Sequence, residues 1–314
     1  MTRIAVAQVG SVAFDPEATT EKAISAITDA ADNGAELIVF PEAFLGTYPK
    51  ALAFDSPIGR RTDNARREFE RYWAGAVELE GTEVARIATA AAERHMFVVL
   101  GIVERVARTL YCTVVFIDEQ GRRVGHHRKV MPTGSERLIW GFGDGSTLPV
   151  VESPAGRLGA VICWENYMPL LRAAMYAQDI AIYCAPTADD RDSWLPTIRH
   201  IALEGRVHVL SACQVMRRSD FPEDYDAVFG TEPDSVLMRG GSAIVAPTGE
   251  LLAGPLFDEE GILYADIDEM ERIRMSFDFD VAGHYARPDI FSLHVDAASK
   301  SPVVFSPSRP TDLD

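Results

Sequence analysis

The 314-residue sequence contains no long hydrophobic run, and this absence excludes a large class of proteins. No segment approaches the roughly 18 consecutive apolar residues that a membrane helix requires. The opening segment, Met1–Gln8, is too short an apolar stretch for a secretory signal and is better explained as a first β-strand. We therefore expect neither a transmembrane helix nor a cleaved leader.

Cysteine is scarce as well. The chain has four cysteines, at positions 112, 163, 184 and 213. Their spacing matches neither a disulfide framework nor a zinc motif, and each lies in an apolar, strand-like run. We expect three of them to pack in the core and Cys163 alone to react. This usage predicts a reduced, cytoplasmic protein.

Basic residues are too few to balance the acidic ones. The chain has 30 Lys and Arg against 47 Asp and Glu, which gives a net charge of −17, and its pI is near 4.8. Nucleic acids and anionic membrane surfaces are bound through basic patches. The balance therefore argues against both as partners and favours a neutral small molecule.

Motifs for metals and organic cofactors are also missing. His126 and His127 are adjacent on a predicted strand, so their side chains point to opposite faces and cannot share a metal ion. The glycine-rich segment 141–145 lacks the preceding strand and following helix of a nucleotide-binding loop. We expect no metal and no cofactor.

What the sequence does contain is a regular alternation of strand and helix patterns. Residues 4–9 predict a strand, residues 16–33 an amphipathic helix that stops at Gly34, and residues 37–40 a second strand. Residues 82–94 predict a further helix. The alternation resumes after Cys163, with a helix predicted at residues 194–205, and continues to residue 267. It predicts an α/β fold in which two sheets pack against each other with helices outside.

Length and composition predict one domain. A chain with 47% hydrophobic residues can bury a large core, and we expect residues 1–300 to form a single domain with a polar, disordered tail at 301–314. Residues 54–67 predict a surface excursion. Residues 217–234 predict a second long loop, either a solvated connector, a pocket wall or an assembly contact.

Three chemically useful residues follow predicted strands. Glu42 comes after the apolar run 37–40, Lys129 closes a basic segment, and Cys163 ends the run 158–162. Ligands of open α/β sheets bind at the carboxyl ends of strands, so these groups can meet. Singly, each has a structural explanation: an inert core cysteine, a capping carboxylate, an exposed lysine. Together, thiol, ammonium and carboxylate favour nucleophilic catalysis.

The sequence around these residues resembles the nitrilase branch of the carbon-nitrogen hydrolase superfamily. The similar blocks are residues 40–49, 127–145 and 163–172, and residues 283–289 add a fourth. The resemblance implies a four-layer α-β-β-α sandwich and a Glu42, Lys129 and Cys163 catalytic triad, with Glu136 in a supporting role. It also implies a homodimer, with larger homo-oligomers as an open alternative.

The resemblance also implies a reaction. Cys163 attacks the nitrile carbon, Glu42 acts as general base, and Lys129 stabilises the negative charge of the tetrahedral intermediate. Two waters then yield a carboxylic acid and ammonia. A tryptophan directly after the nucleophile, here Trp164, resembles the pattern of the nitrile-hydrolysing branch. We expect Trp164 and Tyr48 to contact substrate. Glu165 is expected to be a favourable charge at a helix N-terminus.

Other functions remain open from the sequence. An amidase or carbamoylase of the same fold would use the same three residues on a carbonyl carbon, and a cyanide-degrading relative is a further alternative. A binding or scaffold protein could keep the fold without catalysis, but the presence of all three residues argues against it. The class of nitrile and the ratio of acid to amide product are not determined by the sequence.

Overall fold

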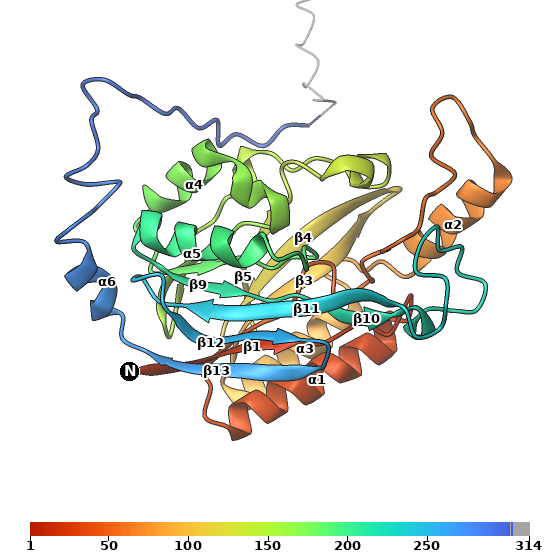
Figure 1. Cartoon of the computed structure of the whole chain (residues 1–314), viewed down its shortest axis with the longest axis horizontal. Coiled ribbons are helices and arrows are strands. Elements are labelled where there is room, and N and C mark those ends of the chain that lie inside the picture. The colour runs from red at the N-terminus through yellow and green to blue at the C-terminus, as the bar shows by residue number, and fades with distance from the viewer. Residues whose placement is uncertain (302, 304–314) are drawn as a thin grey trace, which may run out of the picture.

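The computed structural model describes residues 1–301 and 303, and it contains two β-sheets that pack face to face (Figure 1). The first sheet has the strand order β13-β1-β2-β3-β4-β5. Its strands are β1 (Thr2–Gln8), β2 (Leu37–Val39), β3 (Phe97–Val106), β4 (Thr109–Ile117), β5 (Arg123–Arg128) and β13 (Gly261–Ile267). The predicted tail, 301–314, lies almost entirely outside the described residues.

The second sheet has the order β10-β11-β9-β8-β7-β6, and β12 pairs with β11. Its strands are β6 (Val151–Ser153), β7 (Gly156–Ala160), β8 (Ile182–Cys184), β9 (His208–Ser211), β10 (Val215–Arg217), β11 (Val236–Val245) and β12 (Leu251–Phe257). The short central strands are fully buried, as expected for strands covered on both faces.

Helices cover the outer face of each sheet (Figure 1). On the first sheet lie α1 (Pro16–Asp32) and α3 (Thr82–Arg94), and on the second lie α4 (Pro169–Tyr176) and α5 (Trp194–Gly205). One apolar cluster joins the inner faces of both sheets, and two others join each sheet to its helices. The predicted four-layer α-β-β-α sandwich is confirmed.

Local sequence accounts for the helix limits. Asp15 caps α1 by accepting a hydrogen bond from the Ala18 N–H at 2.9 Å, and Pro16 occupies the first turn. Gly34 follows the helix with a φ of +80°, a conformation that glycine adopts without strain. Within the described residues, no helix is both long and apolar enough to cross a membrane.

One sequence prediction needs correction, and some elements were not predicted at all. The surface excursion predicted at 54–67 is a loop only at first, because α2 (Asp63–Ala74) begins inside it, capped by the Thr62 hydroxyl. The strand β12 and the helix α6 (Met270–Met275) were not predicted. Charge-rich segments such as α2 form amphipathic helices with one narrow apolar face, which a search for apolar runs overlooks.

The direction of the strands brings Glu42, Lys129 and Cys163 to the same end of the two sheets. β1, β2 and β3 are parallel, and β5 has the direction of β3 because β4 is antiparallel to both. In the second sheet, β7, β8 and β9 are parallel. The carboxyl ends of β2, β5, β7 and β8 therefore each deliver a following segment to the site.

Candidate active site

Glu42 lies in a tight turn after β2 and is completely buried. The turn packs against β3 at Gly101, where a Cβ atom would overlap the carbonyl oxygen of Pro41, so the close approach requires glycine. Gln214, from the second sheet, donates to the Glu42 carbonyl oxygen at 2.9 Å. The backbone of Glu42 is thus held from both sheets.

Lys129 immediately follows β5, and its side chain is also completely buried. Its Nζ atom lies 2.6 Å from Glu42 Oε1 and 2.7 Å from Glu136 Oε2. Burial opposes the charge of the ammonium, but the two carboxylates outweigh this effect and raise the pKa of Lys129 well above its usual value. Lys129 therefore stays positively charged.

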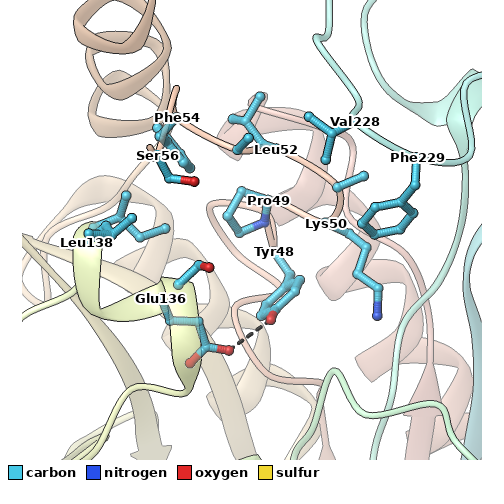
Figure 2. A pocket seen from close by; sticks show the side chains of 14 residues that line it. Tyr48, Pro49, Lys50, Leu52, Phe54, Ser56, Glu136, Leu138, Val228 and Phe229 are labelled. Atoms are coloured by element: carbon cyan, nitrogen blue, oxygen red, sulfur yellow. Dashed lines mark hydrogen bonds between the residues drawn. The ribbon is translucent and has the colours of Figure 1, made fainter. Parts of the chain in front are cut away.

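Glu136 lies in the 3₁₀ helix η1 (Gly134–Leu138) and uses both carboxylate oxygens. Oε2 accepts from the Thr133 N–H at 2.7 Å as well as from Lys129, and Oε1 accepts from the Tyr48 hydroxyl at 2.8 Å (Figure 2). Glu136 thus connects Tyr48 to Lys129. The structure therefore brings Tyr48 and Lys129 into contact with Glu136, the acidic residue that the resemblance placed beside the site.

Cys163 follows β7 and begins the 3₁₀ helix η3 (Cys163–Tyr167). Its φ is +50°, in the left-handed region that non-glycine residues rarely adopt and that marks functional turns. The Thr187 hydroxyl donates to Sγ at 3.1 Å. Burial, followed by the charge of Glu42, raises the pKa of the Cys163 thiol, so it is protonated at neutral pH.

The Glu42 carboxylate sits between these groups. Its Oε1 atom accepts from Lys129, and Oε2 accepts from the Ala188 N–H at 2.8 Å. Burial raises the pKa of Glu42, while Lys129 and the Cys163 thiol oppose this shift by favouring the charged form. The arrangement places a carboxylate of elevated basicity beside a protonated thiol, as base-assisted nucleophilic attack requires.

The family profile for carbon-nitrogen hydrolases matches residues 3–275. The chain belongs to the carbon-nitrogen hydrolase family. A nitrilase from Bradyrhizobium diazoefficiens is 56% identical over 301 residues, covering 96% of this chain and 94% of that protein. An aliphatic nitrilase from Sinorhizobium fredii is 56% identical over 302 residues, covering 96% and 98%. These relatives place the chain in the nitrilase branch, as the resemblance implied.

More distant comparisons agree on the fold. A bifunctional nitrilase/nitrile hydratase from Nicotiana tabacum is 52% identical over 308 residues, covering 97% of this chain and 88% of that protein. A solved structure of the amidase from Nesterenkonia sp. AN1 superimposes with a TM-score of 0.67 at 21% identity, covering 85% of this chain and 94% of that one. At this identity the amidase supports the hydrolase fold alone.

Glu165 lies in the first turn of η3, at the helix N-terminus where we expected it, and it also has contacts that the sequence did not predict. In this carbon-nitrogen hydrolase it is buried, and it accepts from the N–H groups of Val130 and Ile162 and from His127 Nε2 at 2.9 Å. His127 Nδ1 faces the Thr147 carbonyl oxygen at 2.6 Å. Because both neighbours of the imidazole are acceptors, the ring is doubly protonated. Glu165 thus ties the Lys129 loop to the Cys163 turn.

The charge of the His127 imidazole results from opposing effects. Burial disfavours the charged form, but the charge of Glu165 and the hydrogen bonds to Glu165 and Thr147 outweigh burial and raise the pKa of His127. His127 therefore forms a buried ion pair behind the site. It is a structural histidine and ligates no metal in this arrangement.

Trp164 lies next to Cys163 in the sequence, and its side chain contacts a polar cluster. Its Nε1 donates to Asp189 Oδ2 at 2.8 Å, and the Arg191 guanidinium stacks over the ring at 4.7 Å. The side chain is 39% exposed. It is not among the residues lining the pocket of Figure 2. Substrate contact by Trp164 remains a prediction, whereas Tyr48 does line that pocket.

A pocket of about 370 Å³ opens beside Tyr48 and Glu136. Figure 2 shows the Tyr48–Glu136 hydrogen bond at one end and apolar side chains around the rest, among them Leu52, Phe54 and Val228. The long loop 217–234 supplies Val228 and Phe229 to this wall, and its role in a substrate pocket stays a prediction. The described residues contain no group of three or more metal-ligating side chains placed to hold a metal ion.

Sequence reasoning overlooked several residues that shape the site. Thr187 comes soon after β8 and contacts the nucleophile, so the strand-end argument applied to Cys163 also applies to it. Gly101 and Gln214 give no such signal, because their roles depend on the approach of Glu42 from a distant segment. Cys112 was expected only to pack, yet its Sγ lies 3.5 Å from Glu42 Oε1.

Proposed function

We propose that this protein is a nitrilase that converts an apolar organic nitrile and two waters to a carboxylic acid and ammonia. The observation that carries the proposal is the buried Glu42 and Lys129 ion pair next to the Cys163 thiol, within a chain 56% identical to proteins named nitrilases. A thiol, a base and a cation are the groups needed to add water across a carbon–nitrogen triple bond.

The first half of the reaction forms a thioimidate. Glu42 takes the thiol proton as the Cys163 sulfur bonds to the nitrile carbon and passes this proton to the nitrile nitrogen, which leaves a thioimidate and an ionised Glu42. The Thr187 hydroxyl, 3.1 Å from Sγ, stabilises the negative charge that develops on sulfur. A protonated resting thiol makes this base necessary, because little thiolate is present at neutral pH.

The second half consumes both waters. Glu42 activates the first water, which adds to the thioimidate, and the tetrahedral intermediate expels ammonia to leave a thioester. The second water hydrolyses the thioester, which releases the acid and restores the thiol. Lys129 stabilises the tetrahedral intermediates, and Glu136 holds the Lys129 ammonium together with Glu42.

The pocket of Figure 2 supports an uncharged substrate with an apolar organic group. Leu138, Val228 and Phe229 contribute apolar surface, and the ammonium of the lining residue Lys50 pairs with Asp190 at 3.6 Å. Its volume of about 370 Å³ is in the usual range for small-molecule sites. We assign this pocket to the group attached to the nitrile carbon.

The cellular setting belongs to the same proposal. The four cysteines are buried free thiols, which supports a reducing, cytoplasmic location.

Residues 1–300 act as one catalytic domain, and the enzyme works as a homodimer. Light scattering after size-exclusion chromatography measures the assembly directly.

The deciding experiment is ammonia release from a panel of aliphatic, arylacetic and aromatic nitriles and their amides, with acid and amide products separated. We expect acid and ammonia from apolar nitriles. Cys163→Ala should abolish turnover with the fold intact, and Glu42→Gln and Lys129→Ala should each lower kcat/KM by about 10²-fold or more.

Each alternative gives a different result. Turnover of amides alone would assign the chain to the amidase reaction, and release of amide from nitriles would show a hydratase activity, as the Nicotiana tabacum relative's name describes for that protein. Near-normal activity in any of the three variants would refute the catalytic assignments. Inactivity of the wild type on both substrate classes would refute the nitrilase proposal.

A further inference from the structure

Cys112 occupies an unusual place for a packing residue. It lies on β4 in the apolar cluster between the two sheets and is 1% exposed. Its Sγ is 3.5 Å from Glu42 Oε1, within the range of a hydrogen bond involving sulfur. Its carbonyl oxygen accepts the Lys129 N–H at 2.8 Å. One residue of β4 therefore contacts both members of the buried ion pair.

The direction of the sulfur hydrogen bond follows from chemistry. A carboxylate has no proton to donate, so the Cys112 thiol is the donor and Glu42 the acceptor. Burial, with the charge of Glu42, raises the pKa of Cys112 well above its usual value, so the thiol keeps its proton. Cys112 is thus a lasting donor to the proposed base.

The Glu42 carboxylate consequently has three donors besides the nucleophile. Lys129 and Cys112 contact Oε1, and the Ala188 N–H contacts Oε2. A carboxylate offers about four lone-pair directions, so three donors restrict which direction is available for a substrate proton. Donors to a carboxylate also favour its charged form.

We propose that Cys112 is a positioning residue for the general base Glu42. The S–H···O hydrogen bond from Cys112 orients the Glu42 carboxylate and keeps it ionised. This inference rests on the proposed function of Glu42. The thiol contacts the carboxylate of the proposed base and exchanges no proton with it, so the proposal assigns Cys112 no chemical step. Its effect reaches the reaction only through the carboxylate.

Other charged and titratable groups also face Glu42 and must be held constant in a test. They include Lys129 after β5, Glu136 from η1, Cys163 from η3, the Tyr48 hydroxyl and the buried Cys213 thiol. Substituting Cys112 alters none of them directly. A shift in the titration of Glu42 is therefore attributable to the lost or strengthened donor.

The test compares Cys112→Ala, which removes the donor, with Cys112→Ser, which supplies a stronger one in similar volume. The control is Cys184→Ala, because Cys184 is an equally buried thiol of the same inter-sheet cluster whose pKa is raised by burial alone. Melting temperatures of all three variants show whether packing losses are matched. The pH profile of kcat/KM reports the ionisation of Glu42 in the free enzyme.

Loss of a donor to the charged form raises the pKa of a carboxyl group, so Cys112→Ala should move the acid limb to higher pH. At a pH on that limb we expect kcat/KM to fall roughly two- to tenfold, the range for one hydrogen bond. Cys112→Ser should restore the wild-type limb or move it to lower pH. Cys184→Ala should leave the limb unchanged.

A second measurement does not depend on the substrate. The rate of Cys163 alkylation by iodoacetamide, followed by peptide mass spectrometry across pH, reports base-assisted reactivity of the thiol and should show the same ordering of variants. Wild-type limbs in both Cys112 variants, or an equal shift in Cys184→Ala, would overturn the proposal. Absence of wild-type turnover would instead refute the nitrilase function, and the alkylation series would still decide the role of Cys112.

Discussion

Replacing Lys129 with methionine should destabilise the fold as well as abolish catalysis. The wild-type site holds one buried ammonium between two carboxylates, at 2.6 Å from Glu42 and 2.7 Å from Glu136. Lys129→Met keeps much of the side-chain volume but leaves both carboxylates without the cation. Glu42, which is completely buried, then carries an uncompensated charge.

The burial of this ion pair gives the expected loss in the free energy of unfolding. Breaking a buried ion pair by removing one partner costs about 3–5 kcal/mol, because the remaining charge stays in a low-dielectric interior. The double variant Lys129→Met/Glu42→Gln removes both charges. Its glutamine amide oxygen can still accept from the Ala188 N–H, as Glu42 Oε2 does at 2.8 Å. We therefore expect the double variant to recover most of the lost stability while remaining inactive.

Urea unfolding of the wild type, Lys129→Met, Glu42→Gln and the double variant measures the energetic coupling between the two substitutions. The penalty of Lys129→Met should also shrink as pH falls. Burial already raises the pKa of Glu42, loss of the cation raises it further, and a protonated Glu42 is neutral. A loss below about 1 kcal/mol at neutral pH, or additive single-variant effects, would refute the reasoning.

Three further predictions test other contacts. Thr187→Val removes the donor to the Cys163 sulfur in nearly the same volume, so single-turnover acylation should slow roughly tenfold. The melting temperature should also fall, because the Thr187 hydroxyl accepts from the buried Asp189 N–H at 2.9 Å. Gly101→Ala should displace the Pro41 carbonyl and lower both stability and kcat, measured by thermal melting and ammonia release. Because the pKa of His127 is raised in the folded protein, its ion pair with Glu165 contributes its full stabilisation of the fold below pH about 6.5. This stabilisation is lost as the pH rises through the pKa of His127 in the folded state. Glu165→Gln should therefore lower the free energy of unfolding, measured in urea, more at pH 6 than at alkaline pH.

Much of the fold could be predicted from sequence because it depends on local pattern. Helix α3 begins and ends at the predicted residues, 82 and 94, and α5 likewise at 194 and 205. Amphipathic periodicity and helix-stop residues are encoded within a few positions of each other. The central strands were recognisable for the same reason, as short apolar runs bounded by polar residues.

Where prediction failed, the deciding contact came from far along the chain. The sequence predicts the place of Glu165 at a helix N-terminus but not its partner His127, which is 38 positions away. β12 contains only half-buried and exposed residues, and it is held in place by pairing with β11. Such partners become visible only after the sheets have formed.

The sequence by itself determined which chemical groups this protein carries and which strand each one follows: a carboxylate after β2, an ammonium after β5 and a thiol after β7. Only the tertiary structure decided how they meet. The two sheets pack so that the Ala188 N–H reaches Glu42 across 146 positions and Thr187 reaches Cys163. Burial, which depends on every layer of the sandwich at once, then sets the pKa values that make Glu42 a base and keep Cys163 protonated.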